Sequence, residues 1–145
     1  MKKEQEKFLN ELVASYGVHY IKLHQHHWFV EGPHFFSLHE KFEEIYDETT
    51  ANLDEVAERM LMIGGKPVST LAEFLEHSFI DEKKYTQTKA MDMVKEVIAD
   101  LKKFVDKIVD EGYDLFEGDE VTTDLLVGLN EQHDKTIWML EATAK

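Results

Sequence analysis

The sequence contains no cysteine, and this absence removes several classes of site at once. Without thiols the chain cannot form disulfides, bind zinc through thiolates or hold an iron–sulfur cluster. Any metal must therefore be bound by histidine and carboxylate side chains, which suit iron, zinc and manganese. Such side chains are abundant, because the chain carries 8 histidines and 30 aspartate and glutamate residues.

Long apolar runs are also missing from the sequence. No stretch approaches the roughly 18 apolar residues that suffice to cross a membrane. The first ten residues, MKKEQEKFLN, are amphipathic and lack the apolar centre of a secretory signal. We therefore expect a cytoplasmic protein with no membrane partner. Its 145 residues correspond to one domain, 1–145, which is long enough to bury a full core.

Basic residues are outnumbered by acidic ones. The 16 lysine and arginine residues leave a formal net charge of −14 and a pI near 4.9. Such a charge repels the phosphates of nucleic acids and draws cations toward the surface. A plainer interpretation, that the charge only keeps the protein in solution, is open at this point.

Apolar residues recur at three- and four-residue intervals through four long stretches, as in amphipathic helices. The predicted helices are residues 5–29, 34–63, 84–111 and 121–142. Thr70 and Glu73 have the spacing of a capping box and predict a short helix that runs to about Ser78. The predicted fold is therefore all-α, a four-helix bundle with a short extra helix between the second and third long helices. The core positions expected on the first two helices are Leu9, Leu12, Val13, Tyr16, Tyr20, Leu23, Phe35, Leu38, Phe42, Ile45, Leu53, Val56, Met60 and Ile63.

Histidine and carboxylate residues form two pairs on the second predicted helix. His39 and Glu43 are four residues apart, as are Asp54 and Glu58, so each pair shares one helical face. Each pair could hold one metal ion. Fifteen residues separate His39 from Asp54, which corresponds to about 22 Å along a straight helix. One straight helix therefore cannot close both pairs around a single site.

The second helix must then either break between the pairs or share its site with another subunit. The glycine and proline residues that would break it lie outside its range, at Gly32, Pro33, Gly64, Gly65 and Pro67. We therefore favour an unbroken helix. The site would then be shared across a two-fold axis. An isologous contact there places each end of the helix beside the opposite end of the same helix in the other subunit.

His27 continues the apolar stripe of the first predicted helix, one turn beyond Leu23. A lone histidine there is more often a hydrogen-bonded core residue. Its pairing with His39 and the adjacent Trp28 favours a metal ligand instead. The other histidines are expected at the surface or beside the ligands, with His133 either packed or exposed: His19, His24, His26, His34, His77 and His133.

Two segments carry a recognisable signature: HHWFVEGPHFFSLHEKF, residues 26–42, and LDEVAERMLMIGGKP, residues 53–67. They resemble the signature of the Dps family, the small ferritins named as DNA-binding proteins from starved cells. The resemblance implies a ferritin-like four-helix subunit assembled as a hollow dodecamer. It also implies that ferrous iron is oxidised at sites between subunits, preferentially by hydrogen peroxide, and stored inside as ferric mineral. Such a stress-response protein would protect DNA from oxidative damage.

By motif position, the resemblance implies a di-iron site whose ligands come from two subunits. His27, His39 and Glu43 would come from one subunit, and Asp54 and Glu58 from its partner. Many family members carry aspartate where this chain has Glu43.

Two residues beside this motif could assist it. Asp47, one turn beyond Glu43, could hold iron on its way to the site. Trp28 is more often a simple packing residue, but beside an iron site its oxidisable ring could absorb a stray oxidising equivalent.

The start of the fourth predicted helix is crowded with carboxylates. Asp119, Glu120 and Asp124 lie where negative charge is favoured by the helix dipole. The family resemblance offers another interpretation for Glu120 and Asp124, because acidic residues near this helix start line the three-fold pores through which iron enters. Both interpretations are open.

The short predicted helix lies at the two-fold dimer interface in the resembling family. Its residues Phe74 and Leu75, with Phe79 just beyond it, are therefore interface candidates. Packing within the subunit's own core explains them equally well.

Two alternative functions compete with iron storage. The first is a nucleoid protein that coats DNA, for which the acidic charge and the weakly basic ends, MKKEQEKF and ATAK, are unfavourable. The second is a four-helix interaction protein with a vestigial site, which would show no absorbance change with iron. The complete set of five ligands argues against it.

Overall fold

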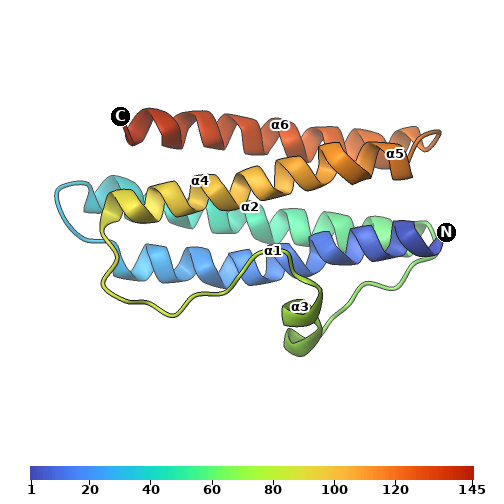
Figure 1. The fold of residues 1–145 in the computed structure, drawn as a ribbon, viewed down its shortest axis with the longest axis horizontal. Helices are drawn as coiled ribbons and strands as arrows, with labels where there is room; N and C mark the ends of the chain where they lie inside the picture. Colours follow the sequence, from blue (N-terminus) through green and yellow to red (C-terminus); the bar gives the residue numbers. More distant parts are fainter.

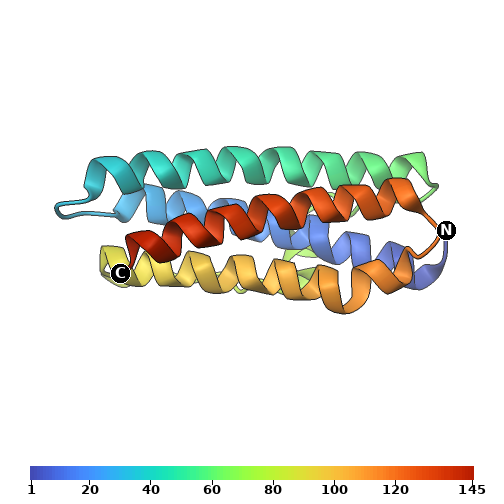
Figure 2. The same cartoon turned by 90° about the horizontal axis from the view of Figure 1, so that it is seen from above.

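The computed structural model describes residues 1–145, and four long helices lie side by side in it (Figures 1 and 2). These are α1 (Lys3–Phe29), α2 (Phe35–Met62), α4 (Ala90–Lys107) and α6 (Glu120–Thr143). Helix α1 packs mainly against α2, and α4 mainly against α6. The connection from α2 to α4 returns along the bundle and contains the short helix α3 (Leu71–His77), so that α2 and α4 run in the same direction (Figure 1). The predicted all-α bundle with a short extra helix is confirmed.

The apolar core consists of two clusters, one in each half of the bundle. Leu12, Met60 and Phe104 belong to the first cluster, and Leu23 and Phe42 to the second. The predicted core positions are buried, except for four that are partly exposed: Tyr20, Phe35, Leu53 and Ile63. Buried polar side chains lie between the two clusters: His19, Lys22, Thr49, Asn52, Asp100, His133 and Thr136. No helix is both long and apolar enough to cross a lipid bilayer.

Helix α2 runs through 28 residues without interruption, as the positions of glycine and proline predicted. Its end is set by Gly64, which has a φ of +91° and so turns the chain in a conformation that other residues rarely adopt. The backbone N–H of Gly65 then donates to the carbonyl of Met60 at 2.7 Å. The alternative of a break between the two ligand pairs is therefore excluded.

The third long helix differs from the prediction at both ends. It begins at Ala90 rather than Lys84, because Tyr85 instead stacks on Phe29 of α1, with ring centroids 4.0 Å apart, and holds this segment in a non-helical path. At its other end the chain does not turn at Gly112. A π-helical turn, η1 (Ile108–Gly112), and one further turn, α5 (Tyr113–Leu115), prolong it.

Gly112 permits this prolonged helix to pack closely on α1. A Cβ atom at Gly112 would lie 2.8 Å from Cζ of Phe8, nearer than packed atoms approach. The chain turns only at Gly118, whose φ is +91°. Helix α6 follows and agrees with its predicted range to within one residue at each end.

Helix α3 is capped as predicted and is anchored on α1. The Thr70 side chain accepts a hydrogen bond from the backbone N–H of Glu73, and its hydroxyl donates to the Glu73 carboxylate at 2.7 Å. Phe74 and Phe79 pack against the subunit's own core, whereas Leu75 is exposed. The dimer-interface role of these residues stays a prediction.

Candidate metal centre

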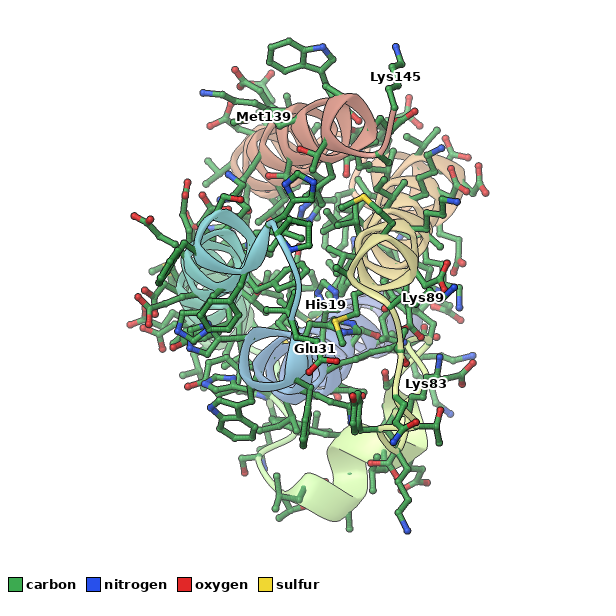
Figure 3. The ribbon with its side chains drawn as sticks, turned by 90° about the vertical axis from the view of Figure 1, so that its left-hand side faces the viewer. His19, Glu31, Lys83, Lys89, Met139 and Lys145 are labelled. Atoms are coloured by element: carbon green, nitrogen blue, oxygen red, sulfur yellow. The ribbon has the colours of Figure 1, made fainter.

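His27 and His39 meet where α1 turns into α2. His27 lies in the last turn of α1 and His39 in the second turn of α2, and the tight connection between them contains Gly32 with a φ of +108°. The two imidazole rings stack, with centroids 3.7 Å apart and planes 14° apart. Figure 3 looks onto this end of the bundle, where Glu31 marks the connection.

Each of the two histidines fixes the tautomer of the other's neutral ring. Nδ1 of His27 lies 2.6 Å from the backbone carbonyl of His39, and Nδ1 of His39 lies 2.7 Å from the carbonyl of His27. A carbonyl oxygen only accepts hydrogen bonds, so both Nδ1 atoms carry a proton and donate. In each neutral ring Nε2 is then unprotonated, which is the form that binds metal.

Glu43 brings a carboxylate to the same end of α2. Its Oε1 atom lies 3.9 Å from Nε2 of His27 and accepts a hydrogen bond of 3.2 Å from the Tyr46 hydroxyl. The Glu43 side chain is 52% exposed, so it is open to an incoming ion, whereas His27 is buried. Two imidazoles and one carboxylate are thus neighbours on one face of the subunit.

Asp54 and Glu58 lie farther along α2, and both are exposed. The unbroken helix keeps Asp54 about 22 Å from His39 along its axis. The subunit contains no group of three or more histidine, aspartate or glutamate side chains whose donor atoms converge on one point. The structure therefore brings His27, His39 and Glu43 near one another but does not bring Asp54 and Glu58 to them.

Trp28 and Asp47 flank this face. Trp28 is 65% exposed, and its ring meets the ring of His24 edge-on at 5.3 Å. Asp47 is exposed one turn beyond Glu43. Both residues are accessible, but no contact links either one to a ligand atom.

The carboxylates at the start of α6 separate into two kinds. Asp119 is the helix cap, because its side chain accepts from the backbone N–H of Thr122, and it also pairs with Arg59 at 3.3 Å. Its hydrogen bonds with Thr122 hold the pKa of its carboxyl below the usual value. Glu120 and Asp124 are exposed and line an open hollow of about 420 Å³. Helix capping therefore explains Asp119 but does not account for the other two.

Two histidines expected at the surface or beside the ligands, His19 and His26, are instead buried against carboxylates of α4, which corrects their prediction. Figure 3 shows His19 in the interior of the bundle. Burial lowers the pKa of His19 well below its usual value and that of His26 to about 4. Between them, Lys22 is also buried, with Nζ 2.9 Å from Asp100 of α4. The sequence does contain a pattern that could have revealed this cluster, because His19, Lys22 and His26 are spaced three and four residues apart and so share one face of α1.

The remaining histidines fit their expected places. His133 is packed, and its Nε2 shares a hydrogen bond of 2.7 Å with the Tyr16 hydroxyl. Burial lowers the pKa of His133 to about 4. His24 and His77 are partly exposed and His34 is exposed.

Comparisons with known proteins agree with this architecture. The model of the ferritin-like domain family matches residues 6–145. DNA protection during starvation protein 2 of Bacillus anthracis is 44% identical over 144 residues, which cover 98% of this chain and 97% of the relative. The crystal structure of Dps from Staphylococcus aureus has a TM-score of 0.94 and 39% identity, and it covers 99% of this chain and 97% of that one. Dps from Listeria innocua soaked with cobalt also has a TM-score of 0.94, with 40% identity, and covers 98% of this chain and 92% of that one. The chain therefore belongs to the Dps family of ferritin-like proteins.

Proposed function

We propose that this protein is a ferroxidase that oxidises ferrous iron at a di-iron site shared by two subunits. The ferric product would be stored as mineral inside a hollow oligomer, the dodecamer that the family resemblance implies. One observation carries the proposal: His27 and His39 each present an unprotonated Nε2 in the neutral ring, beside the open Glu43 carboxylate. This donor set suits iron, which is the substrate.

The second half of the site is assigned to a neighbouring subunit. Asp54 and Glu58 are exposed and make no ion pair or hydrogen bond within their own subunit, so their carboxylates are available. The continuous α2 keeps them away from the histidines of the same chain. A two-fold contact would place them opposite His27, His39 and Glu43 of the partner.

The chemistry requires two ferrous ions and a two-electron oxidant. Each ferrous ion loses one electron, and hydrogen peroxide takes up both electrons and two protons to form two water molecules. A pair of irons thereby reduces peroxide without releasing hydroxyl radical. The carboxylate oxygens favour the ferric product, and neutral imidazole completes the ligand set. The preference for peroxide over dioxygen comes from the family resemblance.

Two neighbouring residues have supporting roles in this proposal. Asp47 lies on the exposed stripe of α2 and offers a transient carboxylate to an arriving ferrous ion. Trp28 lies next to His27 in the chain, and its exposed indole would absorb a stray oxidising equivalent. Neither role requires a direct bond to iron in the resting site.

Anaerobic titration with ferrous iron, followed by separate additions of peroxide and air, tests the proposal. The assembled protein should bind ferrous iron saturably and develop ferric absorbance when peroxide is added. The His27→Ala variant should lose this saturable binding. Equal binding and oxidation by the variant and the unmodified protein would refute the assigned site.

DNA protection is the activity for which the relatives are named. We assign it here to removal of iron and peroxide rather than to coating of DNA, because the net charge of −14 opposes contact with phosphates. A gel-shift titration at low and physiological salt separates the two. We expect no shift at physiological salt, and a stable complex there would favour the DNA-coating function.

A further inference from the structure

Tyr46 is the side chain that contacts the Glu43 carboxylate directly. It lies three residues farther along α2, and its hydroxyl donates to Oε1 of Glu43 at 3.2 Å. Residues three apart on a helix are neighbours on its surface, so this contact needs no distortion of α2. The same Oε1 atom is the one that lies 3.9 Å from Nε2 of His27.

The Tyr46 ring is itself held by residues of α1. It stacks on the His24 ring with centroids 3.8 Å apart and planes 19° apart. The rings of Tyr20 and His27 meet it edge-on, at 5.8 Å and 5.4 Å. His24 is anchored in turn, because its Nδ1 lies 2.8 Å from the carbonyl of Tyr20. The Tyr46 hydroxyl is therefore presented by a ring that packing fixes in place.

Glu43 has no comparable support of its own. Its side chain is 52% exposed and makes no other hydrogen bond. A mobile glutamate loses conformational entropy when it is fixed on an ion, and a partner that orients it beforehand reduces that loss. A tyrosine phenol carries its proton at neutral pH, so the Tyr46 hydroxyl is available as the donor to Glu43.

We propose that Tyr46 is a positioning residue that holds the Glu43 carboxylate beside Nε2 of His27 for metal binding. One lone pair of Oε1 accepts the phenol proton, and the remaining carboxylate lone pairs stay available to the ion. This inference rests on the proposed function, because it assumes that His27, His39 and Glu43 bind iron.

The test replaces Tyr46 by phenylalanine in the assembled protein and measures cobalt(II) binding by its visible absorption. Cobalt(II) is a divalent probe that avoids oxidation during the titration. Tyr46→Phe keeps the ring and its stacking but removes the donor, so cobalt affinity should fall about three- to tenfold. The Tyr20→Phe variant is the matched control, because it removes a hydroxyl from the same aromatic group without touching Glu43, and its affinity should be unchanged.

Repeating the Tyr46→Phe substitution in a protein that also carries Glu43→Asp shows whether the Tyr46 hydroxyl acts through Glu43. In a Glu43→Asp protein the carboxylate is one methylene shorter and is withdrawn from the Tyr46 hydroxyl. Adding Tyr46→Phe there should change cobalt affinity less than about twofold, because the contact is already lost. Thermal unfolding of each variant, followed by circular dichroism, should show the helices intact.

Two results would overturn the positioning role. One is an unchanged cobalt affinity in Tyr46→Phe, and the other is the same several-fold loss in both the Glu43 and the Glu43→Asp backgrounds. A failure of the proposed function is distinguishable, because cobalt binding would then survive His27→Ala unchanged.

Discussion

His27 and His39 hold each other through two reciprocal contacts between a side chain and a backbone carbonyl. Each Nδ1 donates to the other residue's carbonyl, and the two rings stack. The contacts join the end of α1 to the start of α2, so the fold itself orients both nitrogens that we propose as metal ligands. In many metal sites a separate carboxylate or carbonyl orients the histidine ligand, and here each proposed ligand orients the other through its backbone carbonyl.

His133 should make the protein sensitive to mild acid. A histidine in the unfolded chain takes up its proton near pH 6.5, whereas folded His133 does so only near pH 4. Between these values the unfolded state binds more protons, so acidification lowers the free energy of unfolding. Between pH 7 and pH 5 this one residue should account for a loss of about 2 kcal/mol.

Urea unfolding of a His133→Gln variant at both pH values measures this contribution. Glutamine can still form a hydrogen bond with the Tyr16 hydroxyl but does not titrate. The variant should therefore lose less free energy of unfolding between pH 7 and pH 5 than the unmodified protein. An identical loss in both proteins would show that His133 does not contribute.

Packing of α3 on α1 depends on the absence of a side chain at Gly17. A Cβ atom there would lie 2.4 Å from Cδ2 of Phe74. Gly17→Ala should therefore lower the free energy of unfolding by about 1–3 kcal/mol, because α3 must shift away from α1. The measurement is chemical denaturation followed by circular dichroism.

Gly128 provides the matched control for this prediction. It also lies inside a helix, α6, but no neighbouring atom lies within 4 Å of the position that a Cβ atom would occupy there. Gly128→Ala should raise the free energy of unfolding by about 1 kcal/mol through helix propensity alone. A similar gain in Gly17→Ala would contradict the close packing described for α3.

The helices predictable from sequence are those whose apolar spacing is strong. The spacing on α1, α2 and α6 located each end to within about two residues. The segment before Ala90 was wrongly predicted as helix, because the stack of Tyr85 on Phe29 joins residues far apart in sequence. The π-helical turn at Ile108–Gly112 was also missed, and it brings Gly112 close to Phe8, another contact between residues far apart in sequence.

For the candidate site, too, local spacing was predictable from the sequence, whereas contacts between residues far apart in the chain were not. Four-residue spacing placed His39 and Glu43 on one face of α2, and in the structure both lie beside His27. The hydrogen bonds that set the tautomers of His27 and His39 could not be predicted, because they depend on the path of the connection at Gly32. Burial of His19 and His26 was missed because it depends on α4, whose Asp100 and Glu96 face them.

Acidic residues at the start of α6 have a proposed role that would require several subunits. Glu120 and Asp124 line an open hollow. We propose, from the family resemblance, that they line a pore through which iron enters. The Glu120→Gln, Asp124→Asn double variant should slow iron uptake at low salt, where charge attracts cations most strongly. Ferrous binding at equilibrium should be unchanged. Stopped-flow uptake curves that coincide with those of the unmodified protein would remove the pore assignment.

The proposed active site requires two subunits, and mixing of two inactive variants tests this requirement most directly. His27→Ala removes one half-site and Asp54→Ala removes the other, so each variant alone should lack ferroxidase activity. Mixed dimers contain one site with both lesions and one with neither. After random exchange of equal amounts, about a quarter of the sites should be intact.

The measurement is the rate of ferrous iron oxidation after unfolding and joint refolding of the two variants, with subunit exchange verified by mass-tagged chains. We expect activity to return to about a quarter of the unmodified rate, because it scales with intact two-subunit sites. Verified mixed oligomers that remain inactive would contradict a shared site and would place the site within a single subunit.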